Sequence, residues 1–253
     1  MNYKLRTKHG LTLTEMVVVV SIVAVFTVLG LPAIRAFIRS VESEGGTKAM
    51  ISAALSSGRA IAAKEQHYAG VRFQHAYYKD DPDNSPLKAP QYMIFIVHDQ
   101  PNTDLANGFR AVKGLQPIKL PDSVGVMEVV NGNGEIDDSP SGELTDKTTF
   151  SIIFSPAGKL VIHGVRVSNR DGRTTTTSKD DIFNTKSNVQ NGIGMFLQDE
   201  STGDLKEEPS QSKFRIYDKT VFEKLNPLSR YDDYLKDLEV IYINPYTGTM
   251  IEK

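Results

Sequence analysis

One long uncharged, apolar stretch near the start constrains this chain more than any other feature. No charged residue occurs between Glu15 and Arg35, and residues 16 to 34 are almost all apolar. As a helix these 19 residues would measure roughly 28 Å, close to the thickness of the hydrocarbon core of a bilayer. Lys4 and Lys8 precede the stretch, and basic flanks favour the cytoplasmic side. We therefore expect a helix that can span a membrane once, with its N-terminus on the cytoplasmic side.

The two ends of this stretch argue against the simplest membrane signals. A secretory signal peptide would carry small residues at a cleavage site after its apolar part, but residues 29 to 35 read LGLPAIR. A plain membrane anchor gives no reason for Glu15, whose carboxylate is costly to bury beside the apolar stretch unless it is paired. We therefore expect the Glu15 carboxylate to have a partner.

Residues 10 to 32, GLTLTEMVVVVSIVAVFTVLGLP, resemble the N-terminal segment of type IV pilins and type II secretion pseudopilins. The resemblance implies that prepilin peptidase cleaves after Gly10 and methylates the new amino group of Leu11. It makes Glu15 the fifth mature residue, which would set the register of assembly by pairing with the amino terminus of a neighbouring subunit. Pro32 becomes the twenty-second mature residue and would kink the assembly helix. The first mature residue of this family is usually Phe, from which Leu11 departs.

The rest of the chain predicts a helix followed by many short strands, among them strands at 91–98, 148–154 and 160–167 with a hairpin turn at 155–158. Apolar residues recur at helical spacing to about residue 64, and later segments rich in β-branched and aromatic residues alternate with turn-forming residues. With the resemblance, this order implies an α+β, pilin-like fold in which a long N-terminal helix packs on an antiparallel β-sheet. The expected divisions are a cleaved leader at 1–10, a hydrophobic transmembrane and assembly helix at 11–34, an amphipathic helix at 35–66, and a β-rich globular domain at 67–253 with loop insertions around 76–90, 131–147 and 168–213.

Three segments of the globular part sharpen the resemblance. Residues 53–63, 118–126 and 154–158, in that order, are similar to segments of the H-type minor pseudopilins of type II secretion. The long insertions depart from that subfamily.

Sequence motifs for catalysis or metal binding are sparse. There is no cysteine, and none of the five histidines stands in a metal-binding spacing on a helix. The stretch NGNGEIDD resembles a calcium loop with Asn131, Asn133 and Asp137 as candidate ligands, although the first and twelfth EF-hand positions would fall on Val129 and Pro140. A solvated Asn-Gly turn is the alternative. No nucleophile elbow, phosphate-binding loop or dinucleotide-binding glycine pattern occurs, so we expect no enzyme activity and no cofactor other than calcium.

Together these features predict a structural subunit: a minor pseudopilin or pilin-like protein of a type II secretion or type IV pilus-like filament. The resemblance implies that it is a single-pass protein of the inner (cytoplasmic) membrane whose globular domain is periplasmic or extracytoplasmic, and that it can enter a pseudopilus or pilus. Its expected partners are other pilin or pseudopilin subunits, prepilin peptidase, an assembly platform with its ATPase, and inner-membrane lipid. The net charge of −2 gives no bulk attraction to nucleic acid, which we do not expect as a partner. The alternative is a membrane-anchored extracytoplasmic binding protein or enzyme whose function resides in the loop insertions. Secretion, DNA uptake and surface attachment are all open to such a filament.

Overall fold

The computed structural model describes most of the chain after residue 43 and a short helical stretch before it. The described residues are 13, 14, 16–22, 44–78, 85–130, 135–139, 143–172, 177–199 and 207–252. They belong to two compact units, Met1–Gly46 and Thr47–Lys253.

In the first unit, residues 13, 14 and 16–22 are helical. Residues 16–22 rise only about 10 Å as an α-helix, roughly a third of the hydrocarbon thickness of a bilayer. Within the described part of the chain, no helix is both long and apolar enough to cross a membrane. This finding corrects the predicted single-pass location in the inner membrane.

The predicted long N-terminal helix is also wrong for the residues that the structure describes. The long helix found there is α2, Glu44–Glu65, which packs on strands of the second unit. The α-helices that follow have six residues or fewer, and one short 3-10 helix, Leu235–Asp237, comes after them. They are α3 Gln100–Thr103, α4 Glu143–Thr148, α5 Lys186–Gln190, α6 Lys219–Lys224 and α7 Arg230–Asp233.

An eight-stranded sheet forms the largest part of the second unit. Its strand order is β11-β8-β3-β2-β1-β6-β7, with β4 paired to β2. The strands are β1 Ala69–His75, β2 Gln91–His98, β3 Gly108–Ala111, β4 Ile118–Lys119, β6 Phe150–Phe154, β7 Leu160–Val161, β8 Gly164–Val167 and β11 Glu208–Pro209.

The eight-stranded sheet is mixed, which corrects the predicted antiparallel architecture. β3 and β8 run parallel, with Phe109 opposite Val167, and a parallel pair requires a long crossover. Residues 112–163 supply that crossover by carrying the chain through other strands first. A second, four-stranded antiparallel sheet has the order β14-β13-β12-β5, and a small parallel pair is formed by β9 and β10. Their bounds are β5 Val124–Glu128, β9 Phe183–Asn184, β10 Phe196–Leu197, β12 Lys213–Asp218, β13 Ile241–Ile243 and β14 Met250–Glu252.

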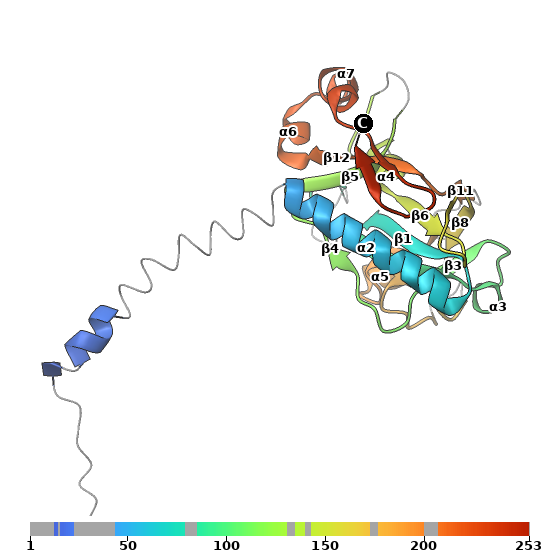
Figure 1. Ribbon diagram of the computed structural model, residues 1–253, viewed down its shortest axis with the longest axis horizontal. Helices are drawn as coiled ribbons and strands as arrows, with labels where there is room; N and C mark the ends of the chain where they lie inside the picture. Colours follow the sequence, from blue (N-terminus) through green and yellow to red (C-terminus); the bar gives the residue numbers. More distant parts are fainter. Residues whose placement is uncertain are drawn as a thin grey trace, which may run out of the picture. The chain divides into compact units, whose positions relative to one another are not determined.

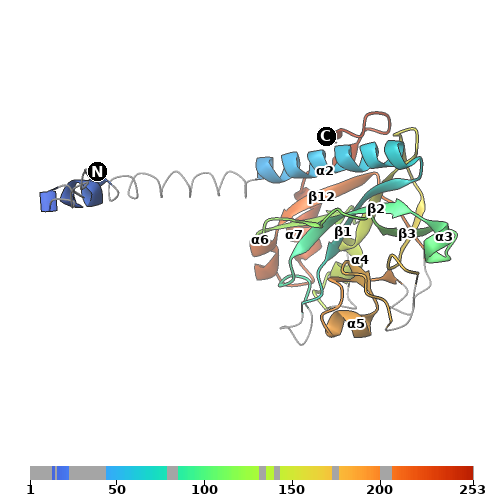
Figure 2. The same cartoon turned by 90° about the horizontal axis from the view of Figure 1, so that it is seen from below.

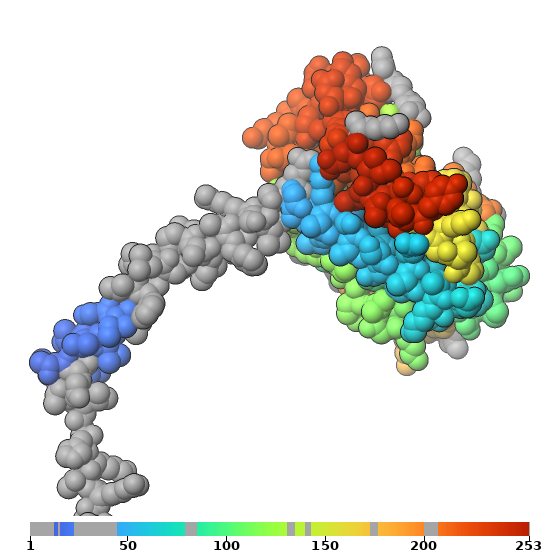
Figure 3. Space-filling view, in the orientation of Figure 1, coloured from blue at the N-terminus to red at the C-terminus, as the bar shows by residue number. Residues whose placement is uncertain are grey.

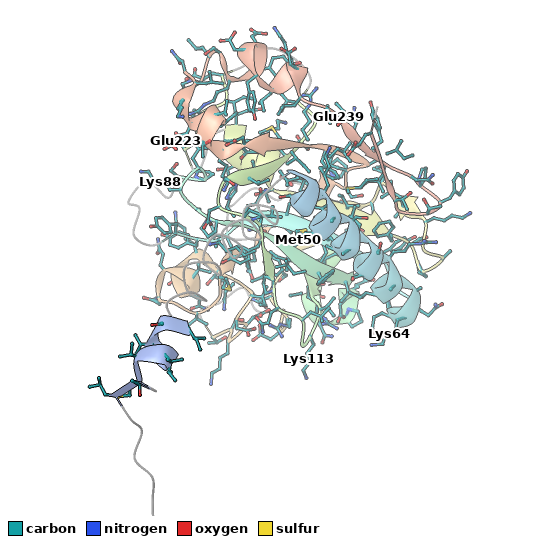
Figure 4. The ribbon with its side chains drawn as sticks, turned by 60° about the vertical axis from the view of Figure 1, so that its left-hand side comes forward. Met50, Lys64, Lys88, Lys113, Glu223 and Glu239 are labelled. Atoms are coloured by element: carbon teal, nitrogen blue, oxygen red, sulfur yellow. The ribbon has the colours of Figure 1, made fainter. Side chains whose placement is uncertain are left out.

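Helix α2 lies across strands of both larger sheets, over β1 and β12 (Figures 1 and 2). Its fully buried Ile51 and Leu55 join one core cluster with residues of both sheets. Figure 4 labels Met50, which packs against this cluster, and Lys64, an exposed residue in the last turn. A Cβ atom at Gly58 would come within 3.3 Å of the Gly70 backbone, so the absence of a side chain at residue 58 lets the helix approach β1 closely.

The predicted loop insertion at 168–213 is well packed where the structure describes it. Phe183 of β9 and Phe196 of β10 are fully buried in a second core cluster that includes Ile94 of β2. Alternate residues of β2 point to opposite faces, so this cluster lies on the face away from α2, and Figure 2 shows α5 on that side. The insertion is therefore a second layer on the sheet.

Candidate functional site

Most of the site residues predicted from the sequence lie outside the described part of the chain. These are the cleavage and methylation residues Gly10 and Leu11, the carboxylate Glu15, the kink residue Pro32, and the calcium candidates Asn131 and Asn133. Asp137 is described. These assignments therefore stay predictions, and the structure describes only nearby residues such as 16–22 after Glu15.

The helical residues that follow Glu15 present an apolar surface. Met16 is 60% exposed, Val20 62% and Ile22 50%, and the three valines at 17–19 are exposed to a similar extent. The one polar side chain of this stretch, Ser21, donates its hydroxyl proton to the carbonyl of Val17 at 2.7 Å, as a serine in a helix commonly does. A continuous apolar surface of this kind is typical of a segment that another molecule covers.

The calcium candidate Asp137 is engaged locally. Its Oδ1 accepts a hydrogen bond from the backbone N–H of Ser139 at 2.7 Å, and this bond lowers the pKa of the carboxyl. Its neighbour Asp138 accepts a hydrogen bond from the hydroxyl of Ser85. Across the described residues, no three acidic, histidine or cysteine side chains gather in a way that could hold a metal ion. The described half of this loop thus has the contacts of an Asp turn.

A shallow apolar pocket of about 420 Å³ lies between the β6–β7 hairpin and the C-terminal strands. In Figure 3 the yellow segment that includes β7 lies beside the red strands at the C-terminus. Ile162, Tyr242 and Ile251 line the pocket and remain 63%, 37% and 41% exposed. Its lining is mostly hydrocarbon, which suits an apolar side chain.

Lys219, the first residue of α6, and the half-buried His75 share one hydrogen-bond acceptor. Lys219 donates to the carbonyl of Ala89 at 3.1 Å, and the Nδ1 of His75 donates to the same oxygen at 3.0 Å. Burial lowers the pKa of Lys219 to about 8, and burial together with the Lys219 charge lowers that of His75 to about 3. Both groups lose their proton at a lower pH than they would in water, so the stability of the fold depends on pH.

A buried ion pair ties the insertion at 168–213 to β1. Arg72 is 2% exposed, and its Nη2 donates to Asp199 Oδ1 at 2.5 Å while its Nε donates to Gln74 Oε1 at 2.7 Å. Asp199 also accepts the backbone N–H of Val167, in β8, at 2.6 Å. The carboxylate therefore joins three segments that are distant in sequence.

Four rings gather at one end of the large sheet. His98 ends β2 directly opposite Phe109 of β3, and His163 lies just before β8, which is paired with β3. The ring centroids of His98 and His163 are 5.9 Å apart, and Tyr68 packs on His163 at 4.5 Å. The sequence gives no local signal for this pair, because the two histidines are 65 positions apart.

Comparisons of the chain with protein-family models, with characterised proteins and with solved structures find no match. The support for a function therefore comes from the residues and contacts described above.

Proposed function

We propose that this protein is a structural, non-enzymatic subunit of a pilin-like or pseudopilin-like filament, cleaved after Gly10 and assembled through the apolar segment that follows. The observation that carries the proposal is the spacing of Gly10, Glu15 and Pro32 around that segment. Its implied partners are other subunits of the same kind, prepilin peptidase, and an assembly platform driven by an ATPase. A minor subunit of a secretion filament is the subfamily that the H-type segments favour.

The exposed apolar surface of residues 16–22 supports assembly on physical grounds. Fully burying one side chain of the size of Val or Ile contributes about 1.5 to 3 kcal/mol, and this stretch offers several such side chains. Packing against equivalent segments of neighbouring subunits would remove that surface from water. Each subunit that joins adds another set of these contacts, so the total stabilisation grows as the filament lengthens.

Glu15 gives the assembly its register. A carboxylate carried into an apolar interface is costly unless it is paired, and the amino group released at Leu11 by cleavage is a cation of the right sign. Pairing Glu15 with the amino group of a neighbouring copy permits one longitudinal offset between subunits and penalises the others. Cleavage and assembly are therefore linked, because the uncleaved chain has no amino group at that position.

Substitution of the carboxylate tests the proposal. We expect Glu15→Leu to be synthesised and cleaved normally but to be lost from the filament fraction of cells that carry the assembly machinery. Glu65→Leu is the matched control, because Glu65 is an exposed carboxylate at the end of α2 whose ion pair with Lys64 lies in solvent. Incorporation of Glu15→Leu at the level of Glu65→Leu would show that the carboxylate has no role in assembly.

A further inference from the structure

The ring cluster at the end of the large sheet contains two histidines that each bond through one ring nitrogen to a backbone carbonyl oxygen. The Nε2 of His98 lies 2.9 Å from the carbonyl oxygen of Ala106, and the Nδ1 of His163 lies 2.5 Å from that of Gly164. A carbonyl oxygen has no proton to give, so in each pair the ring nitrogen is the donor. In the neutral form of each ring, the proton is therefore on Nε2 of His98 and on Nδ1 of His163.

Each ring consequently has one nitrogen with a free lone pair. These atoms are Nδ1 of His98 and Nε2 of His163, and within the described residues neither has a hydrogen-bond partner. Both residues are only half-buried, so solvent and ions can reach them. Histidines that bind metals in proteins share this arrangement, in which one nitrogen donates to a carbonyl and the other is left for the ion.

The separation of the two rings is close to what a shared ion requires. With metal–nitrogen bonds of about 2.1 Å, two imidazoles on a tetrahedral ion have ring centroids about 5.2 Å apart. The observed separation is 5.9 Å at an interplanar angle of 60°, so the rings need to approach by less than about 1 Å to share an ion.

The surrounding aromatic side chains hold the pair in place. The ring centroid of Tyr68 lies 4.5 Å from that of His163 and 6.3 Å from that of His98. The ring centroid of Phe109 lies 5.3 Å from that of His98 and 5.6 Å from that of His163. Phe109 is fully buried, so the cluster is anchored in the second core. An apolar shell of this kind limits the orientations of ligand side chains and excludes competing water from one side.

We propose that His98 and His163 form a two-histidine site for a divalent transition-metal ion that prefers imidazole nitrogen, such as Zn²⁺ or Cu²⁺. No third protein ligand is available among the described residues, so water completes the coordination. The site is independent of the filament function proposed above, because it lies in the second unit and uses none of the residues of the N-terminal segment.

Metal titration of the full chain tests the site. The protein should be purified without a histidine tag and titrated with Zn²⁺ by calorimetry and with Cu²⁺ by electron paramagnetic resonance. We expect one ion per chain, with the Cu²⁺ spectrum showing two imidazole nitrogens. His163→Asn and His98→Asn should each weaken binding at least about tenfold. The control, His67→Asn, alters an exposed histidine next to Tyr68 and should leave the affinity unchanged.

The proposal would be overturned if the wild-type chain bound no stoichiometric ion. It would also be overturned if His163→Asn weakened binding no more than His67→Asn. A further test uses long-range proton–nitrogen correlation spectra of the metal-free wild-type chain and needs no variant. These spectra should show the proton on Nε2 of His98 and on Nδ1 of His163, and the opposite tautomer of either ring would remove its free lone pair from the proposed position.

Discussion

The buried pair of Arg72 and Asp199 makes a sharp prediction about stability. In Asp199→Ala the Arg72 guanidinium, 2% exposed, loses its carboxylate, and the backbone N–H of Val167 loses its acceptor. Removing one partner of a buried ion pair costs about 3 to 5 kcal/mol. The Asp199 side chain is 22% exposed, so water can partly replace it, and we expect the lower end of that range. For a chain of this size, 3 kcal/mol lowers the melting temperature by about 6 to 12 °C.

The stability loss of Arg72→Met, compared with that of Asp199→Ala, tests whether the buried charge is the cause. Methionine fills much of the same space with an apolar side chain, and the remaining carboxylate keeps Val167 and solvent as partners. Arg72→Met also removes the Nε donor from the buried Gln74 Oε1, which costs about 1 to 3 kcal/mol. Urea unfolding should therefore give a loss for Arg72→Met that is measurable but smaller than that for Asp199→Ala. An Arg72→Met loss equal to or larger than that of Asp199→Ala, or losses near zero for both, would refute the reasoning that the uncompensated buried charge dominates.

Further predictions concern pH and packing. Burial holds the pKa of Lys219 at about 8, below its unfolded value of 10.5, so the folded state gives up this proton first and the unfolding free energy should rise between those pH values. The rise should total about 3 kcal/mol. Urea unfolding of Lys219→Met at a series of pH values should show no such rise in the unfolding free energy. His75, with a pKa of about 3 against 6.5, should make stability fall by about 1.4 kcal/mol per unit as the pH drops below 6.5, an effect that His75→Asn should remove if the assignment is right. Gly70→Ala should lower the melting temperature strongly, because the new Cβ would meet the carbonyl oxygen of Ile152 in the neighbouring strand; an unchanged melting temperature would contradict that contact.

Much of the strand pattern could be predicted from the sequence, because short alternating runs end at clear turn residues. The predicted strand at 91–98 is β2, and the predicted hairpin with its turn at 155–158 is confirmed as β6 and β7. Gly158 adopts a φ of +72°, the left-handed conformation that this turn requires and glycine favours.

Tertiary pairing explains where sequence reasoning failed. The predicted strand at 160–167 is split into β7 and β8, because its first residues pair with β6 whereas its last pair with β3. No local pattern contains that choice. In the insertion at 168–213, single apolar residues such as Ile182 lie among polar ones, and composition alone indicates a loop. Those isolated residues are buried because a core already exists for them to join.

The candidate sites differ in the same way. Gly10, Glu15 and Pro32 could be proposed from the sequence because the roles that the resemblance implies for them lie along one continuous segment, where their spacing carries the information. His98 and His163 are brought together only by the pairing of β2 with β3 and of β3 with β8. A site assembled across strands has no fixed spacing, and only the fold can reveal it.

Mass spectrometry of the mature N-terminus tests the central proposal most directly. The chain should be isolated from two otherwise identical hosts, one with and one without an active prepilin peptidase. With the peptidase, we expect the chain to lack residues 1 to 10 and to begin at Leu11 with a methylated amino group, whereas without it residues 1 to 10 should be retained. The same N-terminus in both hosts, or a mature start at any other residue, would contradict the proposal that this is a processed filament subunit.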